Sequence, residues 1–152
     1  MNPFIPILSA SILIGGRVKL RNIPRSKDIF TILNLLDELG CNISFTGHTV
    51  KIDTSNIKNF VARYELVTQM RASVYVLGAL LGRYGKAKVS LPGGCAIGIR
   101  PIDLHLKGFK KLGARISIRQ GYVIATARKL KGNEIYLDFP SVGATCNFCL
   151  LY

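Results

Sequence analysis

Hydrophobic and polar positions along this 152-residue chain follow two periods, one typical of helices and one typical of strands. Between Ser26 and Gly40 apolar residues recur every three or four positions, which predicts an amphipathic helix with Ser26 as its N-cap. The same spacing from about Pro101 to Leu112 predicts a second amphipathic helix. A more uniformly apolar run at about Pro6–Ile14 predicts a buried helix, and residues 72–81 predict one further helix.

Alternating stretches between these helices predict short strands. They cover Arg17–Asn22, Asn42–Phe45, Val50–Asp53, Ala87–Leu91, Arg115–Ile118 and Tyr122–Thr126. The second and third are predicted to form a hairpin, and so are the last two, because a glycine-containing turn separates the members of each pair. One more strand is predicted at Ile135–Asp138, with a helix from about Val142.

The predicted elements occur twice in the same order: helix, strand, helix, hairpin. The Leu-Gly pair at Gly40 and the Leu-Gly pair at Gly113 each precede an isoleucine by three residues, at an offset of 73 residues. We therefore expect an α/β fold built from repeats of about 3–64 and 65–130. The start of a third repeat would occupy 131–152, and the whole chain, 1–152, would be one partial domain.

The two copies differ in one connection. Seven residues separate Leu20 from Asp28, whereas eleven separate Leu91 from Asp103. The additional residues belong to a proline- and glycine-rich loop that carries Cys95. Because a nearby cation lowers the pKa of a thiol, Cys95 beside Arg100 is a candidate reactive cysteine.

The composition is that of a folded, strongly basic chain. Hydrophobic residues make up 49% and charged residues 19%, which excludes a disordered chain, and the formal net charge is +13. Such a charge predicts an anionic partner. The basic residues are scattered rather than clustered in a run, which favours a substrate with phosphates and a carboxylate; a basic nucleic-acid-binding α/β module remains the alternative.

The four cysteines give no disulfide framework and no complete metal site. Cys146 and Cys149 form a single CxxC pair, and Cys41 has the setting of a small core residue. We therefore expect no metal, no disulfide and a cytoplasmic location. The apolar run at residues 3–15 is shorter than the roughly 20 residues that a bilayer requires, so we expect no membrane association.

The string GGCAIG-x-RPxDLH, at residues 93–105, resembles the active-site loop of the UDP-N-acetylglucosamine enolpyruvyl transferases. The shikimate-phosphate branch of the same superfamily shares the repeats but not the cysteine loop. The resemblance implies two domains, each an inside-out α/β barrel of three repeats with helices inside and sheets outside. This chain would hold about two-thirds of one domain and the start of its third repeat.

The resemblance also implies a reaction. An enolpyruvyl group would pass from phosphoenolpyruvate to the 3-hydroxyl of UDP-N-acetylglucosamine in peptidoglycan biosynthesis, without a cofactor. Cys95 matches the family cysteine that acts as general acid, adds covalently to phosphoenolpyruvate and is alkylated by fosfomycin. By the same comparison the substrate-binding residues are Asn2, Arg71, Arg100, Pro101, Ile102, Asp103, Leu104, Ser141, Val142 and Gly143.

Several of these residues also have plainer interpretations. Arg71 is equally typical of a surface cation, Asp103 of a carboxylate placed on a helix dipole, and Ser141 of an N-cap. His105 is expected to be structural. In an unrelated thiol hydrolase, a third interpretation, it would instead be the base for Cys95.

The sequence departs from the family pattern at both ends. Met1 stands where the family has a lysine that grips phosphoenolpyruvate, and CNFCLLY at residues 146–152 stands where the family continues with Glu-Asn and a long apolar helix. By the same comparison we expect the second domain, with its general base and cleft-closing arginines, to be missing. We therefore expect a truncated fragment with no transferase activity by itself, because half a cleft orients neither substrate and does not exclude water.

Overall fold

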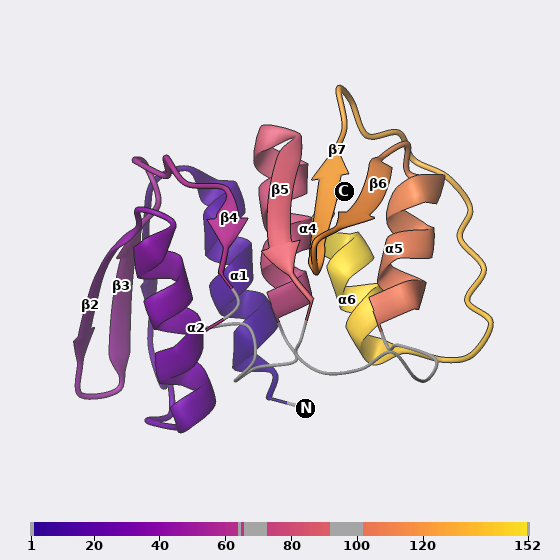
Figure 1. The fold of residues 1–152 in the computed structure, drawn as a ribbon. Helices are drawn as coiled ribbons and strands as arrows, with labels where there is room; N and C mark the ends of the chain where they lie inside the picture. The colour runs from indigo at the N-terminus through magenta and orange to yellow at the C-terminus, as the bar shows by residue number, and fades with distance from the viewer. Residues whose placement is uncertain (1, 64, 66–72, 92–101, 152) are drawn as a thin grey trace.

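Helices and short strands alternate along the chain in the computed structural model, which describes residues 2–63, 65, 73–91 and 102–151 (Figure 1). The helices are α1 (Phe4–Ile14), α2 (Lys27–Glu38), α4 (Ser73–Tyr84), α5 (Ile102–Lys111) and α6 (Val142–Leu151). The strands are β1 (Arg17–Leu20), β2 (Asn42–Thr46), β3 (Thr49–Asp53), β4 (Val61–Ala62), β5 (Lys86–Ser90), β6 (Arg115–Arg119) and β7 (Tyr122–Thr126). These helices and strands confirm the predicted α/β class.

The first sheet has the order β1-β3-β2, and all its pairs are antiparallel. Val50 and Ile52 of β3 are fully buried, whereas Lys51 between them is exposed. Gly47 has a φ of 58° in the β2–β3 turn, a conformation that glycine adopts without strain. The alternation of the sequence therefore sets the face of this sheet that packs on the core.

The second sheet has the order β4-β5-β7-β6. The hairpin of β6 and β7 continues into β5 by antiparallel pairing, whereas β4 pairs in parallel with β5. The sequence did not predict β4, because two residues, Val61 and Ala62, are too few to show an alternation. β4 nevertheless brings the end of the first group of elements into the sheet of the second.

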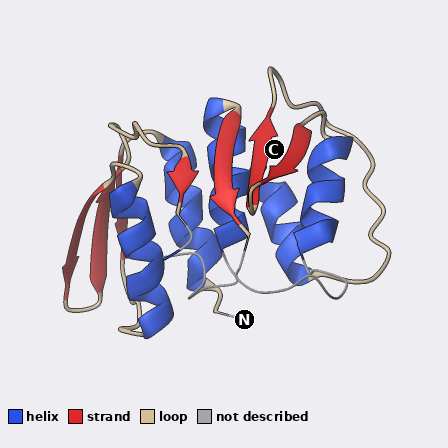
Figure 2. Ribbon diagram, viewed as in Figure 1, coloured by secondary structure: helices blue, strands red, loops and turns tan. Residues whose placement is uncertain are grey.

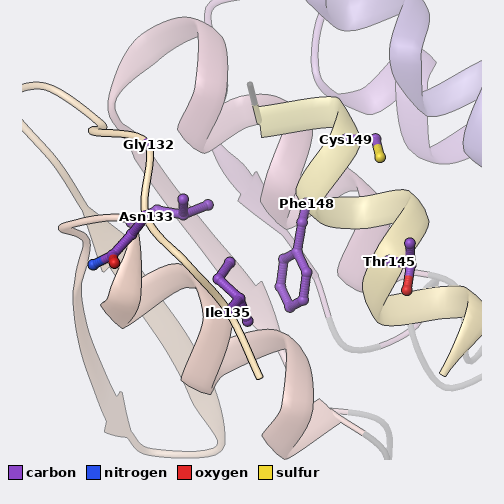
Figure 3. Close-up of a pocket in the computed structure, with 7 residues that line it drawn as sticks. Gly132, Asn133, Ile135, Thr145, Phe148 and Cys149 are labelled. Atoms are coloured by element: carbon purple, nitrogen blue, oxygen red, sulfur yellow. The ribbon is translucent and has the colours of Figure 1, made fainter. Parts of the chain in front are cut away.

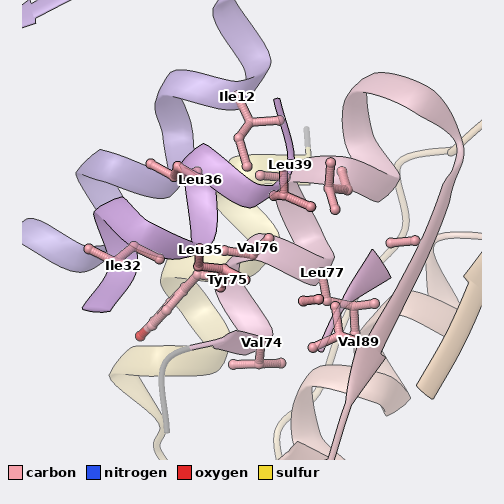
Figure 4. Packing of buried hydrophobic residues seen from close by; sticks show 14 of the residues in the cluster. Ile12, Ile32, Leu35, Leu36, Leu39, Val74, Tyr75, Val76, Leu77 and Val89 are labelled. Carbon is pink, nitrogen blue, oxygen red and sulfur yellow. The ribbon is translucent and has the colours of Figure 1, made fainter. Parts of the chain in front are cut away.

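Helix α4 forms the centre of the molecule. Every residue from Ser73 to Leu81 is buried, and α4 packs against both α1 and α6 (Figure 4). Figure 2 shows the three-stranded sheet at one side of the molecule with α2 and α1 next to it, and the four-stranded sheet over α4. A helix buried on all sides explains why the sequence of α4 is apolar without a polar face.

Close helix packing depends on glycines. A Cβ atom added to Gly78 of α4 would overlap the side chain of Asn147 of α6, and one added to Gly108 of α5 would overlap the ring of Phe148. At the other end of α4, Arg83 donates hydrogen bonds to the carbonyl oxygens of Ile12 at 2.8 Å and Thr54 at 2.9 Å. Arg83 thus ties α4 to the first group of elements.

One detail of the sequence prediction was wrong. Residues 135–138 form no strand. Ile135 packs against the hydrophobic core, and Asp138 forms a salt bridge with Lys107 at 2.9 Å. The segment thus alternates between apolar and polar residues but pairs with no described strand. Ser26 occupies the N-cap position of α2 as predicted, but its hydroxyl makes no capping hydrogen bond and is buried without a partner among the described residues.

Among the residues that the structure describes, no helix combines the length and the apolar character needed to cross a bilayer.

Candidate functional site

The N-terminal ends of α4, α5 and α6 meet at one end of the molecule (Figure 1). A Cβ atom built on Gly143, in the first turn of α6, would lie 3.1 Å from the hydroxyl of Tyr75 in α4 and 3.6 Å from Nε2 of His105 in α5. At the opposite end, Gly82 of α4 lies beside Leu13 of α1 and Leu151 of α6. The helices therefore run in the same direction, and their positive dipole ends point the same way.

Four predicted site residues lie outside the described residues: Cys95, Arg71, Arg100 and Pro101. The remaining seven fall at three helix N-termini. Ile102, Asp103 and Leu104 form the first turn of α5, and Ser141, Val142 and Gly143 begin α6. Asn2 precedes α1.

The three side chains in the first turn of α5 differ in their exposure to solvent. Leu104 is buried at 5% exposure, Ile102 is half-buried against the core, and Asp103 is exposed. Among these three residues only Asp103 has a polar side chain exposed to solvent, and a carboxylate here also interacts favourably with the helix dipole. Both interpretations of Asp103 from the sequence stay open in this geometry.

Ser141 caps α6. Its hydroxyl accepts a hydrogen bond from the backbone N–H of Ala144 at 3.2 Å, and its carbonyl accepts one from the N–H of Thr145 at 3.1 Å. Val142 is 70% exposed. A helix start of this kind presents backbone N–H groups and a positive dipole, the arrangement that binds phosphates in many proteins.

Asn2 plays a comparable part at α1. Its side-chain oxygen accepts a hydrogen bond from the backbone N–H of Phe4 at 3.1 Å, and the residue is half-buried. The hydrogen bond holds the side chain against the helix start. Asn2 thus has a structural role at the start of α1, and the binding role that the resemblance implies stays a prediction.

A buried polar cluster behind the first turn of α6 was not predicted. Asn147 of α6, which has no exposed surface, donates through Nδ2 to the carbonyl oxygen of Val74 at 2.9 Å and contacts Nδ1 of His105 at 3.0 Å. Tyr75 meets the His105 ring edge-to-face, with the centroids 6.2 Å apart. The sequence offered a single signal, one asparagine within the apolar run CNFCLL, but no partner for it.

Burial sets the ionisation of this cluster. It lowers the pKa of His105 to about 4, because the charged imidazolium would lose its hydration. Burial also raises the pKa of the Tyr75 hydroxyl, with a smaller contribution from Cys146. His105 is therefore neutral at pH 7, and the expectation that it is structural agrees with its position.

Three cysteines lie in the described part of the chain, and one of them is deeply buried. Cys41 is 3% exposed, and burial raises its pKa to about 12. Cys146 is half-buried and Cys149 is exposed on α6. In the described part of the chain, no group of three or more His, Cys, Asp or Glu residues is arranged to hold a metal ion.

An apolar hollow of about 650 Å³ lies beside α6, away from its N-terminus (Figure 3). The Phe148 ring and Ile135 face each other across it, between α6 and the segment at residues 132–135. Its other lining residues are Leu112, Gly132, Asn133, Thr145 and Cys149. None of these is a predicted site residue, and none of the described lining residues has a charged side chain that would bind phosphate or carboxylate.

Comparison with known proteins assigns the fold. The chain resembles the enolpyruvyl transferase NikO of Streptomyces tendae, with a TM-score of 0.78 and 19% identity over 97% of this chain and 35% of that one. EPSP synthase of Acinetobacter baumannii gives a TM-score of 0.61 at 17% identity, over 99% of this chain and 36% of the other. These structures share the enolpyruvyl transferase fold with the chain.

The profile of the EPSP synthase (3-phosphoshikimate 1-carboxyvinyltransferase) family matches residues 4–151, so the chain belongs to this family of transferases. Within it, the relatives at about 50% identity are UDP-N-acetylglucosamine 1-carboxyvinyltransferases. UDP-N-acetylglucosamine 1-carboxyvinyltransferase 2 of Carboxydothermus hydrogenoformans is 52% identical to this chain over 149 residues. The enzyme of the same name from Lawsonia intracellularis is 50% identical over 149 residues. The predicted resemblance to the amino-sugar branch is thereby confirmed.

The alignments cover 98% of this chain but 36% of each of these two relatives. The chain thus spans about a third of their length.

Proposed function

We propose that this chain supplies the cysteine loop and part of the nucleotide-sugar site of a UDP-N-acetylglucosamine enolpyruvyl transferase of peptidoglycan synthesis. The observation that carries the proposal is the identity of 50–52% over 98% of the chain with relatives of that name. The finer architecture we propose is about two repeats and the start of a third from an inside-out α/β barrel. The order of α1, β1, α2 and a hairpin, followed by α4, β5, α5 and a hairpin, supports it.

In the proposed reaction Cys95 donates a proton to the methylene carbon of phosphoenolpyruvate. The 3-hydroxyl of the sugar attacks the neighbouring carbon and gives up its own proton to a base in the second domain. Loss of phosphate, together with a proton from the former methylene carbon, then leaves the enolpyruvyl ether. Arg71 and Arg100 would hold the phosphate and carboxylate groups, for which the guanidinium fork is well suited.

The described residues would hold the nucleotide sugar. Ile102, Asp103 and Leu104 at the start of α5 would face the uridine, and Ser141, Val142 and Gly143 at the start of α6 would hold the diphosphate. The convergence of the α5 and α6 N-termini beside Tyr75 supports this arrangement, since it gathers backbone N–H groups and two dipoles at one place. Asn2 would lie beside phosphoenolpyruvate.

Titration of the ¹⁵N-labelled chain with UDP-N-acetylglucosamine tests the binding role. We expect saturable amide shift changes at residues 102–104 and 141–143, and no phosphate release when phosphoenolpyruvate is added, since the chain spans a third of its relatives. The matched control ligand is 3-phosphoshikimate, the acceptor named for the family profile. Saturable binding of 3-phosphoshikimate without binding of UDP-N-acetylglucosamine would overturn the proposal.

A further inference from the structure

Three helices share one buried hydrogen-bonded pair. His105 of α5 is 6% exposed and Asn147 of α6 has no exposed surface. Asn147 Nδ2 lies 2.9 Å from the carbonyl oxygen of Val74 in α4 and 3.0 Å from Nδ1 of His105. Because a buried polar group without a partner costs free energy, these two contacts strongly constrain how the three helices pack.

The donors and acceptors of the pair can be assigned from these contacts. The Val74 carbonyl only accepts, so the group facing it must be the amide NH₂ of Asn147 rather than its oxygen. The same NH₂ faces His105 Nδ1, which must therefore be the unprotonated acceptor. The neutral imidazole then carries its proton on Nε2. In this arrangement Asn147 Oδ1 is buried without a hydrogen-bond partner among the described residues, and it lies against Gly78.

The other nitrogen of His105 faces the first turn of α6. A Cβ atom built on Gly143 would lie 3.1 Å from the Tyr75 hydroxyl, closer than most side chains pack, and 3.6 Å from Nε2 of His105, an ordinary van der Waals contact. The start of α6 therefore packs directly against Tyr75 and His105. Asn147, one turn further along the same helix, holds the His105 ring in this position.

We propose that His105 and Asn147 are positioning residues: Asn147 holds His105 as the neutral Nε2–H tautomer, and the pair sets the first turn of α6 for ligand binding. This inference rests on the proposed function for the binding role of Ser141–Gly143. The orientation of the ring and the order of the helix start are properties of the chain itself, and they are measurable without any ligand.

Long-range ¹H–¹⁵N correlation spectra of the full chain at pH 8 test the tautomer. The chain has two histidines, and His48 provides the internal control, because its Nδ1 lies 3.0 Å from the carbonyl oxygen of Ile23 and must donate. We expect opposite tautomers: Nε2–H at His105 and Nδ1–H at His48. An Nδ1–H tautomer at His105, or averaging between the two forms, would overturn the proposal.

Two substitutions of His105 test whether this residue orders the first turn of α6. His105→Asn keeps a hydrogen-bond acceptor near the place of Nδ1, whereas His105→Leu keeps bulk and removes the acceptor. In His105→Leu we expect hydrogen exchange of the Ala144 and Thr145 amides to accelerate about 10-fold, with the Phe30 amide of α2 unchanged. In His105→Asn we expect exchange within about 3-fold of the original chain. Equal exchange in all three proteins would contradict a positioning role.

Binding of UDP-N-acetylglucosamine to the same three proteins separates the two proposals. We expect affinity to fall about 10-fold in His105→Leu and to recover in His105→Asn. If the original chain binds no UDP-N-acetylglucosamine, the proposed function fails, while the tautomer and exchange results still decide the positioning role. If His105→Leu does not fold, the tautomer in the original chain decides it.

Discussion

At the scale of single residues, His105 makes the stability of the fold depend on pH. Its pKa in the folded chain is about 4, below the ordinary value of 6.5 that it regains on unfolding. The unfolded chain therefore takes up a proton first as the pH falls. We expect the contribution of His105 to be fully present above pH 6.5 and to decline between pH 6.5 and 4, by about 3 kcal/mol in the free energy of unfolding.

Urea unfolding at several pH values, compared with the His105→Asn variant, measures this contribution. The variant is expected to lose most of the pH dependence in that window. Tyr75, which faces the ring from α4, has a raised pKa and stays protonated there, so it does not contribute. Asp53, whose pKa Ser55 and Arg17 hold below its usual value, acts at lower pH. Parallel pH profiles for the two proteins would show that His105 is not buried as described.

At the scale of elements, two glycines of α4 give a matched pair of substitutions. A Cβ atom on Gly78 would overlap Asn147, which is itself fixed by two contacts, whereas one on Gly82 would meet the flexible end of Leu13 at 3.2 Å. Gly78→Ala is therefore expected to lower the free energy of unfolding by about 2–3 kcal/mol through overpacking. Gly82→Ala should be neutral or stabilising by up to about 1 kcal/mol, because alanine favours the helix.

Denaturant unfolding of the two variants measures the difference, with an unchanged dependence on denaturant as the check that both remain two-state. The double variant Gly78→Ala with Asn147→Ser makes room for the new methyl group and should recover part of the loss. Equal stability of Gly78→Ala and Gly82→Ala would mean that α4 and α6 are not in close contact at Gly78.

The elements differ in how well the sequence predicts them, for physical reasons. The stripe of Ile29, Leu33 and Leu36 predicted α2 to within a residue or two, because it follows from local periodicity. The two-residue strand β4 exists only through its parallel pairing with β5, which no local pattern encodes. The alternation at residues 135–138 is real, but a strand also needs a neighbour.

The candidate site shows the same division. The helix start at Ile102 was predicted from the apolar spacing after Pro101, and the one at Val142 from the order of the repeat. The pairing of His105 with Asn147 joins residues 42 positions apart, and their contact depends on how α5 and α6 cross. For Cys95, Arg71 and Arg100 the sequence and the resemblance remain the basis of assignment, because these residues lie outside the described part of the chain.

At the scale of the whole molecule, the positive charge is unevenly distributed. Residues 83–131 contain twelve of the 21 Lys and Arg residues and, among the eight acidic residues, only Asp103. Within the second sheet, Arg119 pairs with Tyr122, whose ring holds the Lys88 ammonium 4.8 Å from its centroid. Like charges gathered in one segment repel each other and oppose folding, and salt screens the repulsion.

Salt is therefore expected to stabilise this chain: raising NaCl from about 20 to 300 mM should raise the melting temperature by about 2–4 °C, or roughly 1 kcal/mol. Arg119→Glu reverses one charge in this basic segment, at a residue that pairs with Tyr122, so it should raise the low-salt melting temperature and reduce the response to salt. The control is Lys58→Glu, an equal charge change at an exposed position outside the basic segment, for which we expect a smaller effect. Calorimetry at the two salt concentrations decides the matter. A melting temperature that does not change with salt would show that charge repulsion does not destabilise the chain. Equal effects of the two substitutions would show that only the total charge matters, and not where it lies in the chain.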